Sequence, residues 1–508
     1  MIRCRILCGF LLLLSPLSMH SSLSSLYATL DPTSVTQHFA FYELYPSSIE
    51  GRKALEHAWE LLSGQCTDCD PGLVFPQIEL QPIISLVHRS SREQTPTLTE
   101  EQLKIIDKLS KHLGNRSLQG FQSVDREEIL KMDPEQIDLA RGLLLFETEE
   151  TNLLKIRSYE AMLDLMALQV LARLEPNATS KQKIRAINDY IFSEMRFRFP
   201  PKSLYAKDID SYSFLPFVLD SRQGVCLGVS ILYLSLAQRL KLPLESITPP
   251  GHIYVRYVGE DGEIINIETT ARGIDLPSEV FLGMETKSLQ KRTLREVIGL
   301  AFMNQAAVSW HNEDPETAIT LYHKAALFFP NDYLLNLFLG LNYLFVGKEA
   351  EGKALLEKIR GVIPNHAITP DSLSEDYLDG LTNGESIRAI FAEVNETRKS
   401  ILTKREELEK VTTQYPKFRQ GIFHLAITYL QLGREKEAIP ILERCAKIDS
   451  QNPTVHYYLA ALHLQRHNYL QSWKHLLSAE AIVKKRDHTP YALEQLRKSL
   501  QRLHPEPL

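Results

Sequence analysis

The sequence of 508 residues lacks the motifs that identify several large enzyme classes. It contains no phosphate-binding loop of the form Gly-x-x-x-x-Gly-Lys-Ser/Thr, no Gly-x-Gly-x-x-Gly for a dinucleotide, no His-Glu-x-x-His for zinc and no Gly-x-Ser-x-Gly. Catalysis that depends on these motifs is therefore excluded, and we expect neither a cofactor nor a metal ion.

An excess of basic residues is also absent. The chain has 57 Lys and Arg against 63 Asp and Glu, so its net charge is −6, or −8 if Arg3 and Arg5 were removed with a leader. This balance argues against a nucleic-acid partner. A hydrophobic content of 44% and a charged content of 24% are ordinary for globular domains, of which the length suggests about three.

Cysteine is scarce, with six residues in the whole chain. Cys66-Thr67-Asp68-Cys69 could form a local disulfide in an oxidising compartment or hold two idle thiols. A zinc site would need two further ligands, and there is no second Cys-x-x-Cys to supply them. Cys226 has no obvious disulfide partner, as a nucleophile requires.

Long apolar runs are absent beyond the first residues. Residues 1–24 combine basic Arg3 and Arg5, an apolar core too short for a comfortable membrane span, and small residues Ser22 and Ser24 spaced for cleavage. This pattern predicts a secretory signal peptide and thus an exported protein, periplasmic or extracellular. The alternatives are an uncleaved anchor or a misassigned start codon.

The chain does contain a thiol, an imidazole and a carboxylate in an order that suits nucleophilic acyl transfer. Cys226 is followed 26 residues later by His252 and a further 16 residues later by Glu268. The helical stripe from Leu227 to Leu240 places Cys226 near a helix N-terminus. The positive end of the helix dipole favours the thiolate there.

The two partners of this cysteine lie in a predicted β-hairpin. The strand-like runs 252–258 and 263–268 flank the turn sequence Glu260-Asp261-Gly262. With Gly262 in the left-handed conformation, Gly259 pairs with Glu263, Tyr254 with Glu268 and His252 with Thr270. His252 and Glu268 then lie diagonally on one face, about 7–8 Å apart by backbone position. A register slip of one residue would move Glu268 to the other face. The predicted apolar face carries Ile253, Val255, Tyr257, Ile265 and Ile267, and the predicted polar face carries His252, Tyr254, Arg256, Asn266 and Glu268.

The residues around the cysteine resemble the bacterial SirB-type branch of the transglutaminase-like superfamily. The resemblance is carried by Leu-Pro-Phe-Val-Leu-Asp-Ser-Arg-Gln-Gly-Val-Cys-Leu-Gly-Val-Ser at 215–230, by Ile-Leu-Tyr at 231–233 and by Pro-Gly-His at 250–252. It covers about residues 180–290 and, more loosely, the helices before them. It implies a papain-like α+β core in which Cys226 is the nucleophile, His252 the base and later the acid, and Glu268 the orienting carboxylate. Glu268 stands where the wider superfamily usually has aspartate, and some members of the branch lack the thiol.

The region before this core is predicted to be a helical packing scaffold. Capping-box patterns at Thr97-x-x-Glu100 and Thr179-x-x-Gln182 predict two helix starts. Between them, residues 134–175 are long enough for two helices. This region carries no recognisable chemistry.

After about residue 291 the sequence repeats with a period of 34, which is typical of tetratricopeptide repeats. Such repeats stack helix pairs and leave a concave groove that usually holds a peptide or protein segment. Alternatively, these helices only cap the first domain. Residues 365–416 keep the pattern poorly and include a charged stretch, Glu385 to Lys410, that is predicted to be helical. The repeat positions are Ala306, Ala318, Tyr322, Ala325 and Pro330, then Gly340, Tyr343 and Pro364, and later Ala426, Tyr429, Ala438, Ala460 and Ala479.

The predicted fold class is mainly α, with an α+β transglutaminase-like core and a C-terminal all-α solenoid of tetratricopeptide repeats. The predicted divisions are a signal peptide (1–24), a helical region (25–180), the transglutaminase-like domain (181–290), repeats (291–364), a helical connector (365–416), further repeats (417–486) and a C-terminal helix or tail (487–508).

Two functions from different classes fit this organisation. The first is an exported cysteine acyl-transfer enzyme, a peptidase, amidase or cross-linker, whose repeats recruit a protein or peptide. The backbone N–H of Cys226 is the natural oxyanion donor, and Tyr212 and Gln223 are further candidates. The second is an inactive exported scaffold that binds proteins through its repeats.

Overall fold

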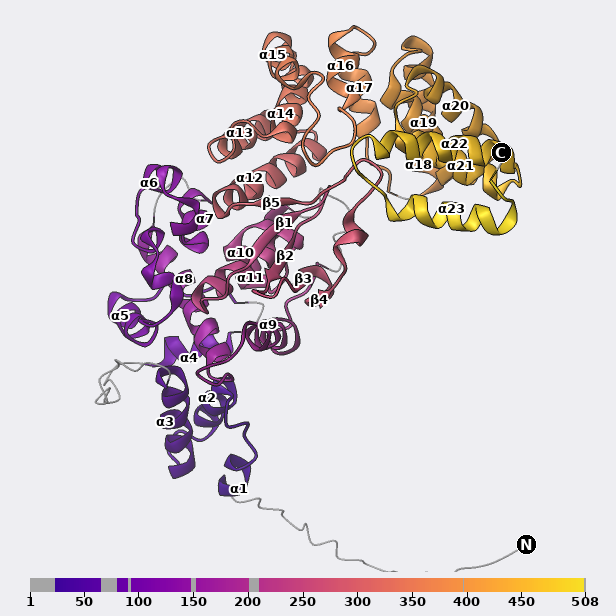
Figure 1. The fold of residues 1–508 in the computed structure, drawn as a ribbon. Coiled ribbons are helices and arrows are strands. Elements are labelled where there is room, and N and C mark those ends of the chain that lie inside the picture. The colour runs from indigo at the N-terminus through magenta and orange to yellow at the C-terminus, as the bar shows by residue number, and fades with distance from the viewer. Residues whose placement is uncertain are drawn as a thin grey trace, which may run out of the picture.

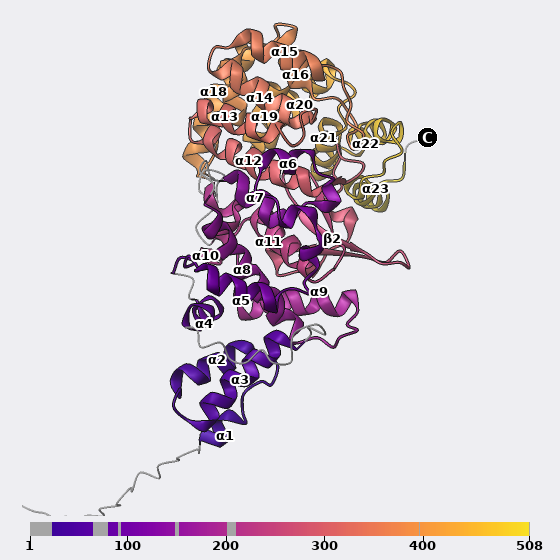
Figure 2. The same cartoon turned by 90° about the vertical axis from the view of Figure 1, so that its left-hand side faces the viewer.

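The computed structural model describes residues 23–64, 80–89, 93–147, 152–200, 210–395 and 397–506. Cys66 and Cys69 lie outside these residues, as does almost all of the predicted signal segment. Within the described part of the chain, no helix is both long and apolar enough to cross a membrane. Figures 1 and 2 show α1–α3 at one end of the molecule and the helices that follow the sheet in an arc at the other end.

Helices make up the described part before the sheet domain, as the sequence predicted. The expected pair between residues 134 and 175 is present as α7 and α8. The helices are α1 (Leu23–Tyr27), α2 (Val35–Leu44), α3 (Ile49–Ser63), α4 (Gln81–His88), α5 (Glu100–Leu109), α6 (Arg126–Lys131), α7 (Leu139–Glu147) and α8 (Leu153–Leu171), with 3₁₀ turns η1 (Gly114–Ser117), η2 (Gln119–Phe121) and η3 (Pro134–Gln136).

One of the two predicted capping boxes is misplaced by two residues. Thr179 caps the following helix with Gln182 as expected. The cap of α5, however, is Thr99 with Gln102, and Thr97 is not involved. Leu98 is almost fully buried, so the chain is still entering the core at the position where the sequence pattern placed the first helical turn.

The next elements form the sheet domain. Its sheet is antiparallel with strand order β4-β3-β2-β1-β5, and α11 packs against β2. The β2–β3 hairpin extends away from the domain in Figure 2. The elements are α9 (Ser180–Asn188), the π-helical turn η4 (Asp189–Glu194), η6 (Asp210–Ser213), α10 (Leu215–Ser221), α11 (Cys226–Arg239), β1 (Glu245–Thr248), β2 (Tyr254–Val258), β3 (Ile264–Glu268), η7 (Thr269–Ala271), β4 (Ile274–Asp275), η8 (Ser278–Phe281) and β5 (Gln290–Arg292).

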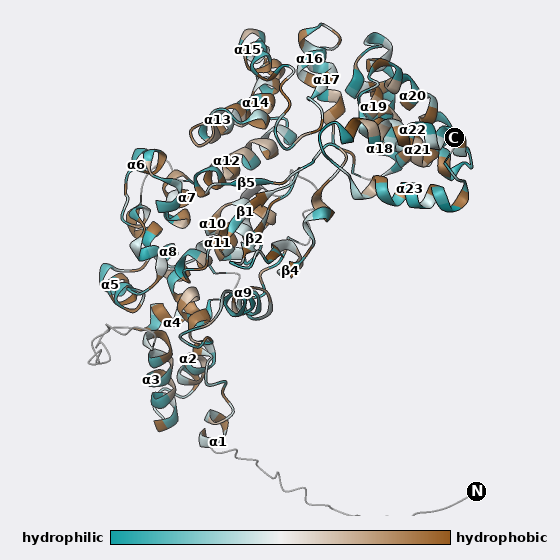
Figure 3. Ribbon diagram, in the orientation of Figure 1, coloured by the Kyte–Doolittle hydropathy of each residue, from teal (hydrophilic) through white to brown (hydrophobic). Residues whose placement is uncertain are grey.

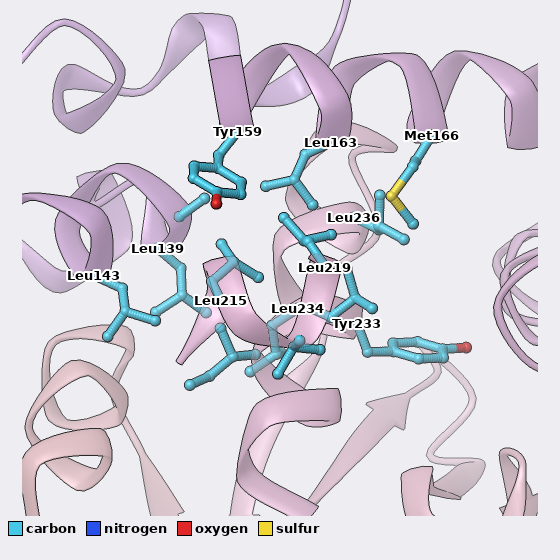
Figure 4. Close-up of a cluster of buried hydrophobic side chains, with 14 of the residues drawn as sticks. Leu139, Leu143, Tyr159, Leu163, Met166, Leu215, Leu219, Tyr233, Leu234 and Leu236 are labelled. Carbon is cyan, nitrogen blue, oxygen red and sulfur yellow. The ribbon is translucent and has the colours of Figure 1, made fainter. Parts of the chain in front are cut away.

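A single hydrophobic core joins these two regions. Its buried side chains run from Val35 to Leu339, and α8 is buried along most of its length. Figure 4 shows side chains of α7, α8, α10 and α11 meeting in this core, for example Leu163 and Met166 opposite Leu236. The helices before residue 180 therefore form a scaffold directly against the cysteine-bearing helix. Figure 3 shows α4 as largely hydrophobic and α9 as largely hydrophilic.

Buried ion pairs also fix α11 to α8. Arg239, at the C-terminal end of α11, donates from Nε to Oδ1 of Asp164 at 2.7 Å, and both side chains are almost inaccessible. Arg116 also bonds the second oxygen of Asp164. Removing one partner of such a pair would leave an uncompensated buried charge, so the far end of α11 is strongly held.

Paired helices follow the sheet, and small residues lie where their helices touch. Ala306, Ala318, Ala325, Ala426, Ala438, Ala460 and Ala479 are fully buried, as the period of 34 predicted. The first pair extends the core of the sheet domain, and later pairs have smaller cores of their own. The helices are α12 (Leu294–His311), α13 (Pro315–Ala326), α14 (Tyr333–Phe345), α15 (Glu349–Ile359), α16 (Ser372–Leu378), α17 (Gly384–Phe391), α18 (Arg398–Gln414), α19 (Arg419–Gln431), α20 (Glu435–Ile448), α21 (Pro453–Gln465), α22 (Tyr469–Lys484) and α23 (Tyr491–Leu503).

The charged stretch from Glu385 to Lys410 is not one helix. It is divided between α17 and α18, with a break after Phe391. Asn395 accepts from the side chain of Thr397 at 2.6 Å, and Thr397 caps α18 by accepting from the backbone of Ser400. This local capping competes with helix continuation and separates the two helices.

Candidate active site

Cys226 is the first residue of α11 and is partly accessible. Val225, the residue before it, is extended and donates its N–H to the carbonyl of Tyr212 at 3.3 Å. Gly228 lies so close to the same carbonyl that a Cβ atom there would be 2.1 Å from the oxygen. The helix start is therefore fitted tightly against η6. The backbone N–H groups of the first turn have no intrahelical acceptor, so they form a region of positive potential beside the thiol.

The hairpin has the predicted register. Val255 pairs with Ile267 and Arg256 with Asn266, and Gly262 has a φ of +81°. The strands are shorter than the predicted runs, because β2 begins at Tyr254 and β3 at Ile264. His252 thus precedes the strand. It lies on the predicted face, the one that also carries Tyr254 and Glu268.

The register brings His252 and Glu268 into direct contact. Nε2 of His252 lies 2.6 Å from Oε2 of Glu268. The imidazole side chain is 25% exposed, whereas the carboxylate side chain is only 6% exposed. Since Nε2 faces the carboxylate, Nδ1 is the nitrogen left for a second partner. The thiol of Cys226 lies near enough to the imidazole to contribute to its raised pKa.

Thr270 holds the other oxygen of Glu268. The Thr270 hydroxyl and backbone N–H both donate to Oε1, at 2.6 Å and 3.0 Å. Burial alone would raise the pKa of Glu268, but the hydrogen bonds from His252 and Thr270 outweigh it and lower that pKa. The carboxylate therefore stays charged and fixed in orientation.

The environment of His252 favours its charged form. Burial alone would lower the pKa of His252, but the hydrogen bonds and negative charges of Cys226 and Glu268 outweigh it and raise the pKa to about 10. An imidazolium between a thiol group and a carboxylate is the arrangement that a thiolate nucleophile requires.

The predicted polar face of the hairpin is covered rather than solvated. Tyr254, Asn266 and Glu268 are all at most 4% exposed. Phe281 of η8 stacks on Tyr254 with ring centroids 4.6 Å apart and on His252 at 5.9 Å. Both faces of the sheet are therefore packed, with α11 on one side and the segment after β4 on the other.

Sequence reasoning missed several residues that hold the site. Beside Thr270 and Phe281, Ser230 and Thr269 share a buried hydrogen bond of 3.0 Å that joins α11 to the turn after Glu268. The Thr269-Thr270 pair directly follows Glu268, so a search for hydroxyls next to the acid could have found it. Phe281 gave no comparable signal, because nothing in its local sequence indicates which surface it covers.

The two further oxyanion candidates, Tyr212 and Gln223, both lie near the helix start. The ring of Tyr212 packs edge-on against Phe217, and the backbone of Gln223 pairs with Arg198. Cys445 offers a contrast to Cys226, because it is 2% exposed and burial raises its pKa to about 12. Of the two cysteines among the described residues, Cys226 is therefore the accessible one.

Residues 157–297 match the Transglutaminase-like superfamily, a range that begins within α8. Two proteins of Xylella fastidiosa, each named UPF0162 protein, from strains Temecula1 and 9a5c, are 24% identical to this chain over 139 residues. The matched segment is 26% of this chain and spans about half, 47%, of each relative.

The solved structures that match the chain resemble it only weakly. MamA AMB-1 shares 18% identity, covers 37% of this chain and 92% of its own, and has a TM-score of 0.20. A thermophilic TPR protein of Thermus thermophilus shares 15% identity, with 40% and 97% covered and a TM-score of 0.20. The repeats are recognised here by their paired helices and buried alanines. The chain thus joins a transglutaminase-like superfamily domain to helical repeats of the tetratricopeptide type.

Proposed function

We propose that this protein is a cysteine acyl-transfer enzyme that acts on an amide of a protein or peptide. The observation that carries the proposal is the contact of 2.6 Å between His252 and the buried carboxylate of Glu268, beside a cysteine at a helix N-terminus. A buried structural histidine needs no neighbouring thiol. It also needs no carboxylate partner whose second oxygen is held by another residue, as Thr270 holds Glu268. The combination is that of a nucleophile, an acid–base group and an orienting carboxylate.

The chemistry assigned to each group follows from its position. The thiolate of Cys226 attacks the carbonyl carbon, and the backbone N–H groups at the start of α11 stabilise the oxyanion. The imidazolium of His252 gives its proton to the leaving amine. Water or a second amine then attacks the thioester, with His252 accepting its proton. Water makes the enzyme a peptidase or amidase, and an amine makes it a cross-linker.

The remaining parts of the proposal concern place and partners. The N-terminal segment supports export to the periplasm or the extracellular space, and the motif at 215–233 supports membership of the SirB-type branch. The stacked helix pairs support recruitment of a protein or peptide, since repeats of this kind present extended binding surfaces.

The first test measures alkylation of Cys226 by iodoacetamide, followed on its own peptide by mass spectrometry between pH 5 and pH 9. In the parent we expect rapid alkylation that persists on the acidic side of neutrality and falls at least tenfold in His252→Ala. Cys445 in the same sample is the internal control for an inert thiol. Slow alkylation that is indifferent to His252 would show that the site is not assembled for catalysis.

A second test separates an enzyme from a scaffold. Cys226→Ala in the producing organism should reproduce the phenotype of gene deletion, with normal protein abundance. If Cys226→Ala is silent while changes in the repeats are damaging, the protein acts as a binding scaffold.

A further inference from the structure

We propose that residues 276–287, called the strap below, are a positioning element through which the C-terminal repeats hold His252 in place. The inference deepens the proposed function, on which it rests for its catalytic consequence. Phe281 is the positioning residue at the near end of the strap, and Glu285 is the anchor at its far end.

The near end of the strap is bound to the hairpin face that carries the imidazole. Phe281 lies nearly parallel to His252, with an interplanar angle of 17°, and to Tyr254, with an angle of 23°. Three polar contacts fix the strap beside this stack. The Asn266 side chain donates to the carbonyl of Leu276 at 2.6 Å and to the Ser278 hydroxyl at 3.0 Å, and Arg256 donates to the same hydroxyl at 3.2 Å.

The far end of the strap is bound by residues that come 83 to 205 positions later in the chain. Glu285 accepts from the hydroxyls of Thr369, at 2.5 Å, and Thr454, at 2.7 Å. Its backbone carbonyl accepts from Ile368 at 3.0 Å. His488 donates to the carbonyl of Gly283 at 2.8 Å.

Further contacts extend this junction between the strap and the C-terminal repeats along residues 284–287. Thr286 forms a β-bridge with Ala367, and the backbone of Lys287 donates to the carbonyl of His366 at 2.9 Å. Met284 packs against the core formed by α21, α22 and α23. Figure 1 shows the segment after β4 leaving the sheet and running toward α23.

The physical consequence follows from the short distance along the chain between the two ends. Glu285 follows Phe281 by only four positions, so a shift of the junction with the repeats cannot be absorbed far from the aromatic stack. The face of Phe281 stabilises the imidazolium and limits its rotation away from Glu268. A partner that moves α21–α23 would therefore change the reactivity of Cys226 without touching it.

The experiment uses the full chain and two readouts. The first is the rate constant for alkylation of Cys226 across pH. The second is the ring resonance of His252 in protein labelled with ¹³C-histidine, assigned with His252→Ala. Phe281→Leu should lower the rate between about twofold and tenfold and shift the His252 resonance as the ring current is lost. Phe281→Tyr retains an aromatic ring and should restore both.

The remote arm is the double variant Thr369→Val and Thr454→Val, which removes both hydroxyls from Glu285 and leaves the strap sequence intact. It should shift the His252 resonance and lower the rate in the same direction as Phe281→Leu. Thr413→Val, an exposed threonine of α18 that bonds only the Glu409 backbone among its described contacts, is the matched control and should change neither.

The outcomes separate the two proposals. If the parent rate depends on His252 but the double variant, correctly folded by circular dichroism, leaves rate and resonance unchanged, the strap does not transmit position and this inference is wrong. If the parent rate is indifferent to His252, the acyl-transfer proposal fails. The His252 resonance then still decides whether the repeats position the imidazole.

Discussion

The charge of Glu268 is what distinguishes an orienting carboxylate from an ordinary strand residue. Glu268→Gln keeps the acceptor for Thr270 but places a neutral amide against Nε2 of His252. Because the negative charge of Glu268 helps raise the pKa of His252 to about 10, we expect that pKa to fall. Alkylation of Cys226 at neutral pH should slow by about tenfold or more, the size expected for losing a charged hydrogen bond. An NMR titration of His252 measures the first effect and mass spectrometry the second.

Glu263→Gln is the matched control for this prediction. Glu263 immediately precedes the same strand and pairs at the surface with Lys181. Exposed pairs contribute little, so this variant should leave both the titration and the rate at parent values. A Glu268→Gln protein that behaves like the control would show that the carboxylate does not support the imidazolium.

The contact between His252 and Glu268 could be predicted because side chains alternate between the two faces of a strand and because one turn residue sets which residues pair. Once Gly262 is placed in the left-handed conformation, every cross-strand pair follows. The contributions of Thr270 and Phe281 could not be read in the same way. Thr270 acts through a turn beyond the ladder, and Phe281 reaches the imidazole from a segment whose path is set by its junction with the repeats.

The start of α11 owes its position to close backbone contact. In Gly228→Ala the new methyl group would meet the Tyr212 carbonyl and also lie 2.8 Å from Val218. Alanine favours the helix by about 1 kcal/mol, but forcing apart a packed backbone costs about 1–3 kcal/mol. We expect a lower thermal unfolding midpoint and slower alkylation of Cys226. Gly384→Ala, at the start of α17, meets only ordinary contacts at 3.5 Å or more and should not lower the midpoint.

Three buried histidines make the last repeat pair sensitive to acid. His456, His463 and His475 are at most 8% exposed, and Nδ1 of His456 lies 3.0 Å from Nδ1 of His475. This contact requires an unprotonated nitrogen. Burial lowers the pKa of all three, that of His475 to about 4, and the nearby carboxylates of Glu443 and Asp449 do not offset it.

The sign of the pH effect follows from these lowered values. In the unfolded chain these histidines bind protons near pH 6.5, whereas in the folded protein they stay neutral to lower pH. Their contribution to the free energy of unfolding is therefore complete above pH 6.5 and is lost as the pH falls toward 4. Each histidine contributes a slope of up to about 1.4 kcal/mol per pH unit. The protection of α21 and α22 against hydrogen exchange, taken relative to the intrinsic exchange rate at each pH, should fall between pH 6.5 and pH 5, and less steeply in His475→Phe. A change at exposed His323, such as His323→Gln, should leave the pH dependence as it is. Equal slopes in all three proteins would contradict the prediction.

The helices themselves were predicted better than their ends. Small side chains recur every 34 residues where paired helices touch, so the sequence itself indicates the repeat pairs. The start of α5 and the break after Phe391 depend on which of several neighbouring polar residues captures a backbone N–H. Thr97 and Thr99 are equivalent by composition, and burial of Leu98 between them decides the outcome.

The division into domains drawn from the sequence does not correspond to separate cores. The buried cluster that contains Leu163 of α8 and Leu236 of α11 continues to Leu339 of α14. Sequence patterns assign each helix its own apolar face but do not say which faces meet. A boundary at residue 181 therefore follows the chemistry of the site, whereas the packing places the scaffold, the sheet domain and the first repeat in one unit.

This shared core predicts that residues 181–290 do not fold when produced alone. The isolated fragment would expose the faces of α10 and α11 that α7 and α8 cover in Figure 4, and it would leave Arg239 without Asp164. We expect it to lack a cooperative thermal transition by circular dichroism, whereas a fragment of residues 23–364 retains one because its core is complete. A cooperative transition in the short fragment would show that the scaffold is dispensable. In the longer fragment Glu285 has lost Thr369 and Thr454, so Cys226 should alkylate more slowly than in the full chain although Cys226, His252 and Glu268 are unchanged.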